Sequence, residues 1–305
     1  MNAPNQGLTE PARLTPAEVG LVAEEAASCL GEAALLSDVA ARAIEASANP
    51  ESTIGQISAI IEQDAGLSIQ LIRISNSSLY ARGRPVDSLD RALMTLGLKE
   101  CRNVIFASGI SRLMQEINVQ EDWIRNVVCE HGFVTATICR HLNEHLRLGM
   151  CGQEFAAGLL HDIGYVAIAA ARPQWFHDVT GLCAGESTNV RDEEDDMWGA
   201  NHADIGAAFA ALVKMPHNLV DVVRTHHQMA GESLSALTQL IRFGDALASH
   251  VQTGALASTF DFAGNAFYRR AVESRSIDVR EDIPVLLTRI SEVVDEAALI
   301  STAFS

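Results

Sequence analysis

Basic residues are scarce in this chain. Lysine and arginine together number 22, against 39 aspartates and glutamates, and the formal net charge is -17. A protein that binds nucleic acid needs a basic face to replace the counterions of the phosphate backbone. We therefore expect no nucleic-acid partner, although a negative net charge is compatible with one local basic patch.

Long apolar runs and paired cysteines are also missing. The apolar run Val166–Ala171 ends at Arg172-Pro173, well short of the ~20 residues that span a bilayer. No basic segment followed by an apolar one stands at the start, so no secretory signal is visible. The cysteines are scattered, without CxxC spacing, at Cys29, Cys101, Cys129, Cys139, Cys151 and Cys183. We expect reduced thiols in a cytoplasmic protein with no membrane segment.

Runs of β-branched residues with period-two alternation are absent as well, and apolar residues recur at helical spacing instead. For example, Thr53 can cap a helix over Ile54–Gln63 that Gly66 ends, and Gly97 stops another. The sequence therefore predicts an all-α fold. The predicted helices are Glu18–Leu30, Leu36–Ala46, Ile54–Gln63, Leu67–Ser75, Leu89–Leu96, Leu98–Gln115, Trp123–Arg147, Phe155–Ala171, Arg191–Gly199, Asn201–Lys214, Pro216–His227, Ser235–His250 and Pro284–Ala303.

A length of 305 residues suits two lobes of ordinary domain size. Residues 1–16 are polar and predict a disordered lead-in. Residues 17–118 then form an N-terminal helical lobe, and residues 119–305 form a second helical lobe with the C-terminal helices. We expect the chain to pass between the lobes near Asn118–Glu121.

The most informative stretch places His161-Asp162 in the middle of the apolar helix Phe155–Ala171. An unpaired buried carboxylate costs at least several kcal/mol, so Asp162 needs a hydrogen-bond partner, a cation or a metal. Neighbouring side chains on a helix point about 100° apart, so the two residues would reach one metal ion only obliquely. The rest of the chain must supply their partners.

Several motifs resemble one known family. In the N-terminal lobe they are Ile60–Leu67, Arg73–Ser77 and Arg84–Ala92 running to Leu96-Gly97, and in the second lobe Ala157–Gly164, His202–Ala207 and His226-His227. Over residues 20 to 230 the chain resembles the HDOD proteins, bacterial signalling relatives of the HD phosphohydrolases. The resemblance implies a two-lobed helical fold whose C-terminal lobe is an HD-like bundle. It implies a regulatory role more often than a catalytic one.

The same resemblance implies a metal site. HD-type hydrolases hold one or two divalent metals, and the positions that match their ligands are His131, His161, Asp162, His202, His226, His227 and Asp245. Mixed imidazole and carboxylate ligands suit Fe, Mn, Ni or Zn. Asp162 is the one candidate catalytic residue.

Each of these residues also has an ordinary explanation. Histidine near a helix end suits the helix dipole, which would account for His226-His227, and Asp245 would suit a solvated helix face. Histidines that we assign to the ordinary class are His141, His145, His177, His217 and His250. The joint order of the seven residues, rather than any one of them, predicts the site.

Three departures separate the chain from the HD-GYP enzymes that cleave cyclic di-GMP. Tyr165 stands where those enzymes usually carry a lysine three residues after the aspartate, and tyrosine does not neutralise a phosphate. Gln228–Glu232 replaces the Gly-Tyr-Pro segment, and Val127 stands where trimetallic members carry a glutamate. We do not expect cleavage of cyclic di-GMP.

Three functions stay open from the sequence. The first is a signalling or scaffolding module that binds an unidentified protein partner and retains a metal or ligand site. The second is a metal-dependent phosphohydrolase for a nucleotide or phosphoester, with Arg82 or Arg84 contacting phosphate. The third is a relic in which His161 and Asp162 form a hydrogen-bonded pair in an empty site.

Overall fold

The structure is a computed structural model that describes residues 14–29, 37–49, 51–76, 80, 85–116, 122–150, 152–175, 190–228 and 234–304. Several predicted features lie outside the described residues: the lead-in up to residue 13, the passage between lobes at Asn118–Glu121, the arginines Arg82 and Arg84, and Met229–Glu232.

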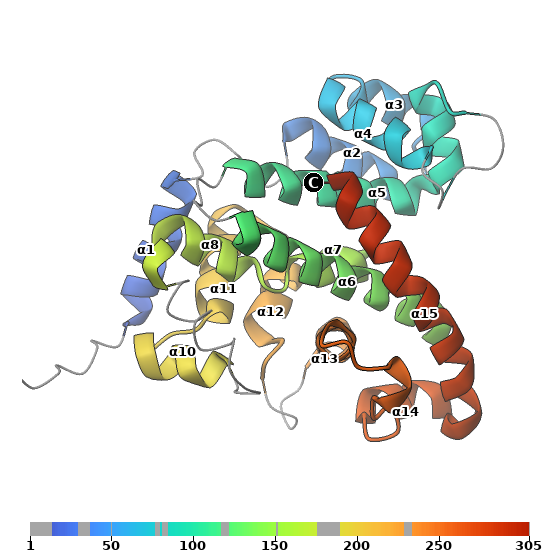
Figure 1. The fold of residues 1–305 in the computed structure, drawn as a ribbon. Coiled ribbons are helices and arrows are strands. Elements are labelled where there is room, and N and C mark those ends of the chain that lie inside the picture. Colours follow the sequence, from blue (N-terminus) through green and yellow to red (C-terminus); the bar gives the residue numbers. More distant parts are fainter. Residues whose placement is uncertain are drawn as a thin grey trace, which may run out of the picture.

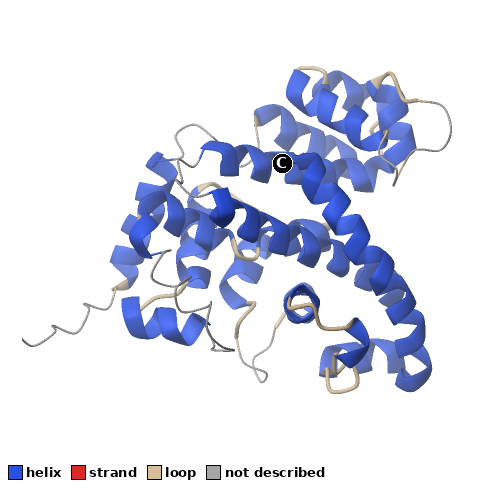
Figure 2. Ribbon diagram, in the orientation of Figure 1, coloured by secondary structure: helices blue, strands red, loops and turns tan. Residues whose placement is uncertain are grey.

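Helices make up all the regular structure of the described residues, which confirms the all-α prediction (Figure 2). In chain order they are α1 (Pro16–Cys29), α2 (Asp38–Ala48), α3 (Ile54–Ile61), α4 (Ala65–Ser75), α5 (Leu89–Glu116), α6 (Asp122–Leu146), α7 (Gln153–Leu160), α8 (Ile163–Ala171), α10 (Val190–Trp198), α11 (His202–Leu212), α12 (His217–Thr225), α13 (Ala236–Gln252), the short 3₁₀ helix η1 (Ala257–Thr259), α14 (Ala266–Glu273) and α15 (Val279–Phe304).

Side-chain caps fix several helix starts. Thr53 and Gln56 form a capping box at α3, because each side chain accepts a backbone N–H of the other residue. Asp64 accepts from Leu67 N at 3.0 Å, so α4 begins at Ala65. The predicted break between these two helices is present, but it lies at residues 62–64 rather than at Gly66, because the capping carboxylate starts the second helix one residue before the glycine. Gly97 kinks α5 with φ 78°, as its predicted role as a stop requires.

The helices gather around two packing centres (Figure 1). Helices α2, α3 and α4 pack on one another and on α5. Helix α6 packs against α7, α13 and α15, while α8, α11 and α12 complete the larger group. Helix α1 packs against α8 and α11 although it precedes α2 in the sequence. A lobe boundary near residue 118 stays a prediction.

A partly buried polar triad connects α5 to α6. Arg140 on α6 is 5% exposed and contacts Glu100 on α5 at 2.7 Å, and Tyr80 OH donates to the same carboxylate at 2.9 Å. Burial, followed by the charge of Glu100, raises the pKa of Tyr80. Loss of one partner would leave the other charge unpaired in a largely buried place, so the triad opposes separation of α5 from α6.

The C-terminal part differs most from the prediction. Helix α15 begins at Val279, so Pro284 lies inside the helix rather than at its start. Helix α14 and η1 were not predicted, because their eight and three residues are too short for a periodic apolar pattern to stand out. Tyr268 of α14, wholly buried, anchors this segment by donating to Asp282 of α15 at 2.7 Å.

One stretch of the described residues, Gln153–Ala171, has the length and composition to cross a membrane. However, 78% of its most apolar part is buried inside the fold. Its two halves, α7 and α8, pack against α6 and α11. The apolar composition is therefore that of a core segment, since the centre of a helical bundle demands the same residues as a bilayer.

Candidate metal centre

The His161-Asp162 pair lies at a break between two helices. The prediction of one helix over Phe155–Ala171 is wrong, because α7 ends at Leu160, Asp162 has φ −100° and ψ 20°, and α8 begins at Ile163. In a continuous helix the two side chains would diverge by about 100°. The turn brings His161 Nε2 within 3.3 Å of Asp162 Oδ2. Both side chains thus face one site.

The remaining predicted residues come from the helices around this turn. His131 lies on α6, His202 begins α11, His226-His227 follow α12, and Asp245 lies on α13. The ligand atoms form two groups that could hold a metal ion: Asp162 with His202, His226 and His227, and Asp162 with His131 and His161. Asp245 joins the second group through His131 Nε2 at 3.1 Å. All seven predicted residues lie in one cluster.

Asp162 is the centre of the cluster. Its Oδ1 lies 3.3 Å from His226 Nε2 and 3.5 Å from His202 Nε2. Its Oδ2 lies 3.3 Å from His161 Nε2 and 3.9 Å from His131 Nε2. The two carboxylate oxygens therefore face two different pairs of imidazoles.

Four histidines make a polar contact through Nδ1, the ring nitrogen that points away from Asp162. His161 Nδ1 contacts Gly158 O at 2.8 Å, and His226 Nδ1 contacts Val223 O at 2.7 Å. Because a carbonyl oxygen only accepts, each of these Nδ1 atoms carries the proton. The other two contacts are His202 Nδ1 with Glu194 Oε2 at 2.6 Å and His131 Nδ1 with Gln252 Oε1 at 2.7 Å. In the neutral ring, an acceptor at Nδ1 leaves the lone pair on Nε2, as in metal-binding histidines.

Three atoms at the centre are buried and have no hydrogen-bond partner in the described part of the chain: His161 Nε2, Asp162 Oδ1 and His226 Nε2. Leaving a buried polar atom unpaired costs about 1–3 kcal/mol. Coordination to a divalent cation would satisfy all three at once. The residues present therefore fit a metal.

The electrostatics of the cluster agree with its geometry. Burial raises the pKa of Asp162, but His161 and its neighbours outweigh it and hold this pKa well below the usual range. Burial lowers the pKa of His161, but the Asp162 carboxylate overcomes it and raises the pKa to about 9. The pKa of Asp245 is lowered to about 2, because the hydrogen bond from His131 outweighs burial. Both carboxylates are thus ionised at neutral pH and available to a cation.

His202 and His227 form a contact of their own. Their Nε2 atoms lie 2.9 Å apart. Burial lowers the pKa of His202, but Glu194 overcomes it and raises the value, whereas burial and the charge of His226 lower the pKa of His227 to about 3. Of these two rings, His202 therefore holds a proton more readily than His227.

Tyr165, the residue at the lysine position of the HD-GYP enzymes, packs on a candidate ligand. Its ring stacks on the His202 imidazole, with centroids 4.3 Å apart and planes 20° apart. The side chain therefore supports the orientation of His202, which is a different role from binding a phosphate.

A scan against family models matches residues 34–229 to the HDOD domain. The chain belongs to the HDOD family. A curated relative of this HDOD chain, an uncharacterized protein of Treponema pallidum, is 24% identical over 206 residues, which are 67% of this chain and 39% of that protein. The chain thus spans less than half the length of that relative.

Solved structures show the same fold. An HDOD domain protein of unknown function from Geobacter sulfurreducens has a TM-score of 0.75 at 22% identity, covering 93% of this chain and 98% of that one. A protein named as a candidate signal transduction protein from Marinobacter aquaeolei has a TM-score of 0.68 at 18% identity, covering 95% and 69%. Other structures with this fold are named as candidate phosphohydrolases, one of them metal-dependent.

Two residues that orient the candidate ligands of this HDOD protein were not predicted. Glu194 is fully buried and binds both the Nδ1 and the backbone N of His202, the latter at 2.8 Å. In the sequence, Glu194 stands among other acidic residues, and its one distinguishing signal is that it shares a helix face with Met197 and Trp198, three and four residues on. Gln252 lies seven residues after Asp245 on α13, so both reach His131 from one face.

Glu194→Gln is expected to weaken binding of a divalent metal by about 10- to 100-fold, because an uncharged acceptor makes the His202 imidazole less basic. The side-chain volume and one acceptor oxygen are retained, so the variant should fold, but loss of the buried charge beside His202 should lower the melting temperature of the metal-free protein. A calorimetric titration with the divalent metal measures the metal affinity of each variant. Asp192→Asn, an exposed carboxylate on the same helix, is the control. Equal affinities of the Glu194→Gln and wild-type proteins would contradict this role.

Proposed function

We propose that this HDOD protein is a signal-transduction module that binds a divalent metal between α6, α8, α11, α12 and α13. The observation that carries the proposal is the group of buried atoms at the centre that make ion-pair contacts of 3.3 Å but no hydrogen bond: two imidazole Nε2 atoms and one carboxylate oxygen. A domain kept only for its shape would gain stability by replacing them with apolar groups. Their retention favours a bound cation.

Fe, Mn, Ni and Zn suit the donor set, since imidazole and carboxylate ligands are mixed. Asp162 divides the donors: Oδ1 faces His202 and His226, while Oδ2 faces His161 and His131. That division supports two ions that share one carboxylate. A divalent ion there would supply Lewis acidity toward a phosphoryl or carboxyl oxygen.

A regulatory role is favoured over a catalytic one. Tyr165 stacks on His202, and no lysine occupies its position to neutralise a phosphate. We propose that metal binding fixes the packing of the larger helical group, and that a signalling partner protein binds the helical lobes. The partner is a protein rather than nucleic acid, because the chain carries a net charge of -17.

The second candidate is a metal-dependent phosphohydrolase acting on a nucleotide or phosphoester. It is favoured by the presence of the whole predicted donor set, which a non-catalytic site does not require. A screen of phosphomonoesters and phosphodiesters with the Mn- or Fe-loaded protein separates the two functions. Turnover that Asp162→Ala abolishes would establish the enzyme and overturn the regulatory proposal.

Metal uptake is expected to release at least one proton per protein at pH 7.5. The His161–Asp162 pair stabilises the metal-free fold below the unfolded histidine pKa, and this contribution is lost as the pH rises through about 9. At pH 7.5 His161 is therefore still protonated, and a metal must displace that proton. Affinity should rise with pH up to about 9.

Titration calorimetry in two buffers of different ionisation enthalpy counts the released protons. Elemental analysis of protein purified without chelator identifies the metal. A protein that contains no metal and takes up neither Mn, Fe, Ni nor Zn would leave the cluster a hydrogen-bonded relic and overturn the proposal.

A further inference from the structure

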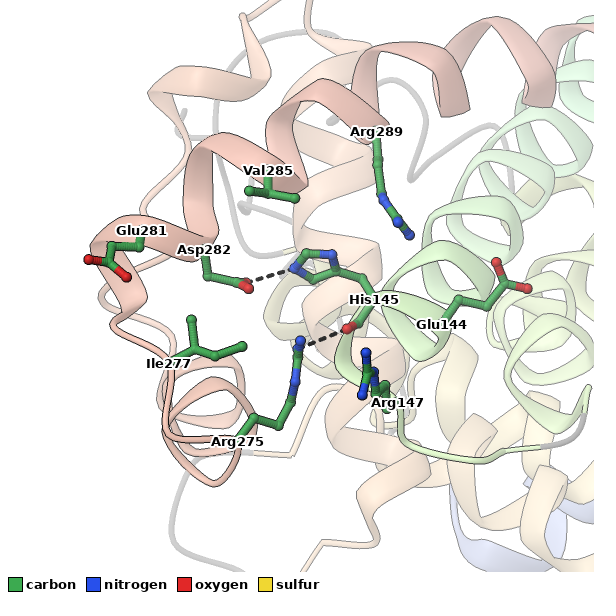
Figure 3. A pocket seen from close by; sticks show the side chains of 9 residues that line it. All are labelled: Glu144, His145, Arg147, Arg275, Ile277, Glu281, Asp282, Val285 and Arg289. Atoms are coloured by element: carbon green, nitrogen blue, oxygen red, sulfur yellow. Dashed lines mark hydrogen bonds and ion pairs between the residues drawn. The ribbon is translucent and has the colours of Figure 1, made fainter.

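A second pocket lies away from the metal centre, where the C-terminal end of α6 meets α15 and the turn that follows α14. Its volume is about 400 Å³, and none of its lining residues belongs to the metal cluster (Figure 3). Three of the chain's 22 basic residues line it: Arg147, Arg275 and Arg289. Figure 3 shows their side chains extending toward the pocket from three separate segments.

Arg147 holds an unusual backbone position. Leu148 N donates to Asn143 O at 3.0 Å and Arg147 N to Glu144 O at 3.3 Å, which is the Schellman pattern at a helix C-terminus. Arg147 takes the left-handed position of that motif, with φ 54°, where glycine is preferred. A non-glycine residue is strained there, so its side chain is a candidate for function.

The base of the pocket is rigid. His145 Nε2 and Tyr268 OH both contact Asp282 Oδ2 at 2.7 Å, and all three side chains are buried. Arg275 Nη1 donates to His145 O at 2.8 Å, which fixes the guanidinium against the end of α6. The dashed lines in Figure 3 mark the contacts of His145 with Asp282 and with Arg275. The pocket is therefore built on a fixed network rather than on surface side chains alone.

The charges in the pocket favour an anion. The Asp282 carboxylate is in hydrogen-bond contact with His145 and Tyr268, and the Glu144 carboxylate forms an ion pair with Lys99 at 3.2 Å. Glu281 is then the one lining carboxylate without an ion pair among the described residues. Within that same part of the chain, neither Arg147 nor Arg289 has a carboxylate partner. Once Lys99 neutralises Glu144, three guanidinium groups share the pocket with the carboxylates of Glu281 and Asp282, which leaves one positive charge in excess in a chain that is otherwise strongly acidic.

We propose that this pocket binds a phosphorylated small molecule. Guanidinium groups match phosphate oxygens with paired, charge-assisted hydrogen bonds. A volume of about 400 Å³ lies in the range of small-molecule sites. Ile277 and the half-exposed Val285 supply an apolar wall beside the arginines, which suits the non-phosphate part of a nucleotide-sized ligand. This site is independent of the metal centre.

Arg147→Gly tests the proposal without risk to the fold, because glycine is the preferred residue at its left-handed position. The measurement is the affinity of the full chain for inorganic pyrophosphate, obtained by titration calorimetry. Loss of a charged hydrogen bond should weaken binding at least about 10-fold. The melting temperature should stay the same or rise, since the backbone strain is relieved.

Lys214→Gly is the matched control. Lys214 has φ 59° at the end of α11, where Lys214 N donates to Ala211 O and Met215 N to Ala210 O in the same Schellman pattern. The variant makes the same change in charge and backbone at a position outside the pocket. Binding should keep its wild-type affinity.

Two more comparisons locate the bound anion. Arg289→Gln should weaken binding, whereas Arg280→Gln, an exposed arginine on the same helix, should not. Wild-type protein treated with a chelator to remove metal should keep its pyrophosphate affinity, because the metal centre is not the binding site. Wild-type protein that fails to bind millimolar pyrophosphate, binding lost equally in Lys214→Gly, or binding lost on metal removal and kept in Arg147→Gly would each overturn the proposal.

Discussion

Asp162→Ala is expected to weaken the binding of divalent metal by about 100-fold or more. Residues that only orient a ligand typically contribute 10- to 100-fold, and Asp162 is itself the shared donor of both ligand groups. Its two oxygens lie 3.3 to 3.9 Å from four imidazoles. Asp245 Oδ1 approaches His131 and His161, which belong to one ligand group, so it does not replace the carboxylate that both groups share. Elemental analysis and metal titration measure the loss.

Two further variants separate metal binding from stability. Asp162→Asn keeps the volume and one carbonyl acceptor, so it should lose metal affinity with a smaller change in the unfolding free energy than Asp162→Ala. Breaking a buried ion pair costs about 3–5 kcal/mol, which sets the upper range for the alanine variant without metal. Asp221→Asn, an exposed carboxylate on α12, is the control. Full metal occupancy in both Asp162 variants would place the metal elsewhere.

The sequence predicted the helices well because local signals determine them. Thr53 caps the helix that the sequence assigned to it, and Asn201 and Ser235 cap the helices that were predicted to begin at these residues. Each cap depends on residues two or three positions away. The seven-residue cluster followed from a family resemblance, since its members lie on five separate segments and no spacing rule joins them.

What was missed depends on contacts between distant residues. Gln252 meets His131 across 121 positions, and Tyr165 stacks on His202 across a helix crossing. The helix break at Asp162 is a tertiary effect of the same kind. The stretch is apolar enough to continue as one helix, and the surrounding imidazoles favour the turn that aims its carboxylate at them.

The close approach of α8 and α11 is another long-range feature that positions the site. A Cβ atom on Gly164 would overlap the backbone carbonyl oxygen of His202 and lie 2.6 Å from its carbon. A Cβ atom on Gly206 would lie 2.9 Å from Gly164 Cα. Both residues are glycines in the motifs that carry the family resemblance. Their absent side chains let the two backbones touch, which brings Asp162 and His202 together.

Gly164→Ala is therefore expected to destabilise the metal-free protein by about 3 kcal/mol or more. Overpacking typically costs about 1–3 kcal/mol, and the clash here is with backbone that cannot rotate away. Separation of α8 from α11 should also move His202 from Asp162 and lower metal affinity. Urea unfolding without metal gives the first quantity, and metal titration gives the second.

Gly20→Ala on α1 is the matched control for that experiment, because an added Cβ there meets nothing within 4 Å. Alanine in a helix interior is favoured over glycine by about 0.8–1.0 kcal/mol, so this variant should be slightly more stable than wild type. The same chemical change thus has opposite signs at two helix positions, which separates backbone contact from helix propensity. A Gly164→Ala protein with wild-type stability and metal affinity would show that α8 and α11 do not touch at this point.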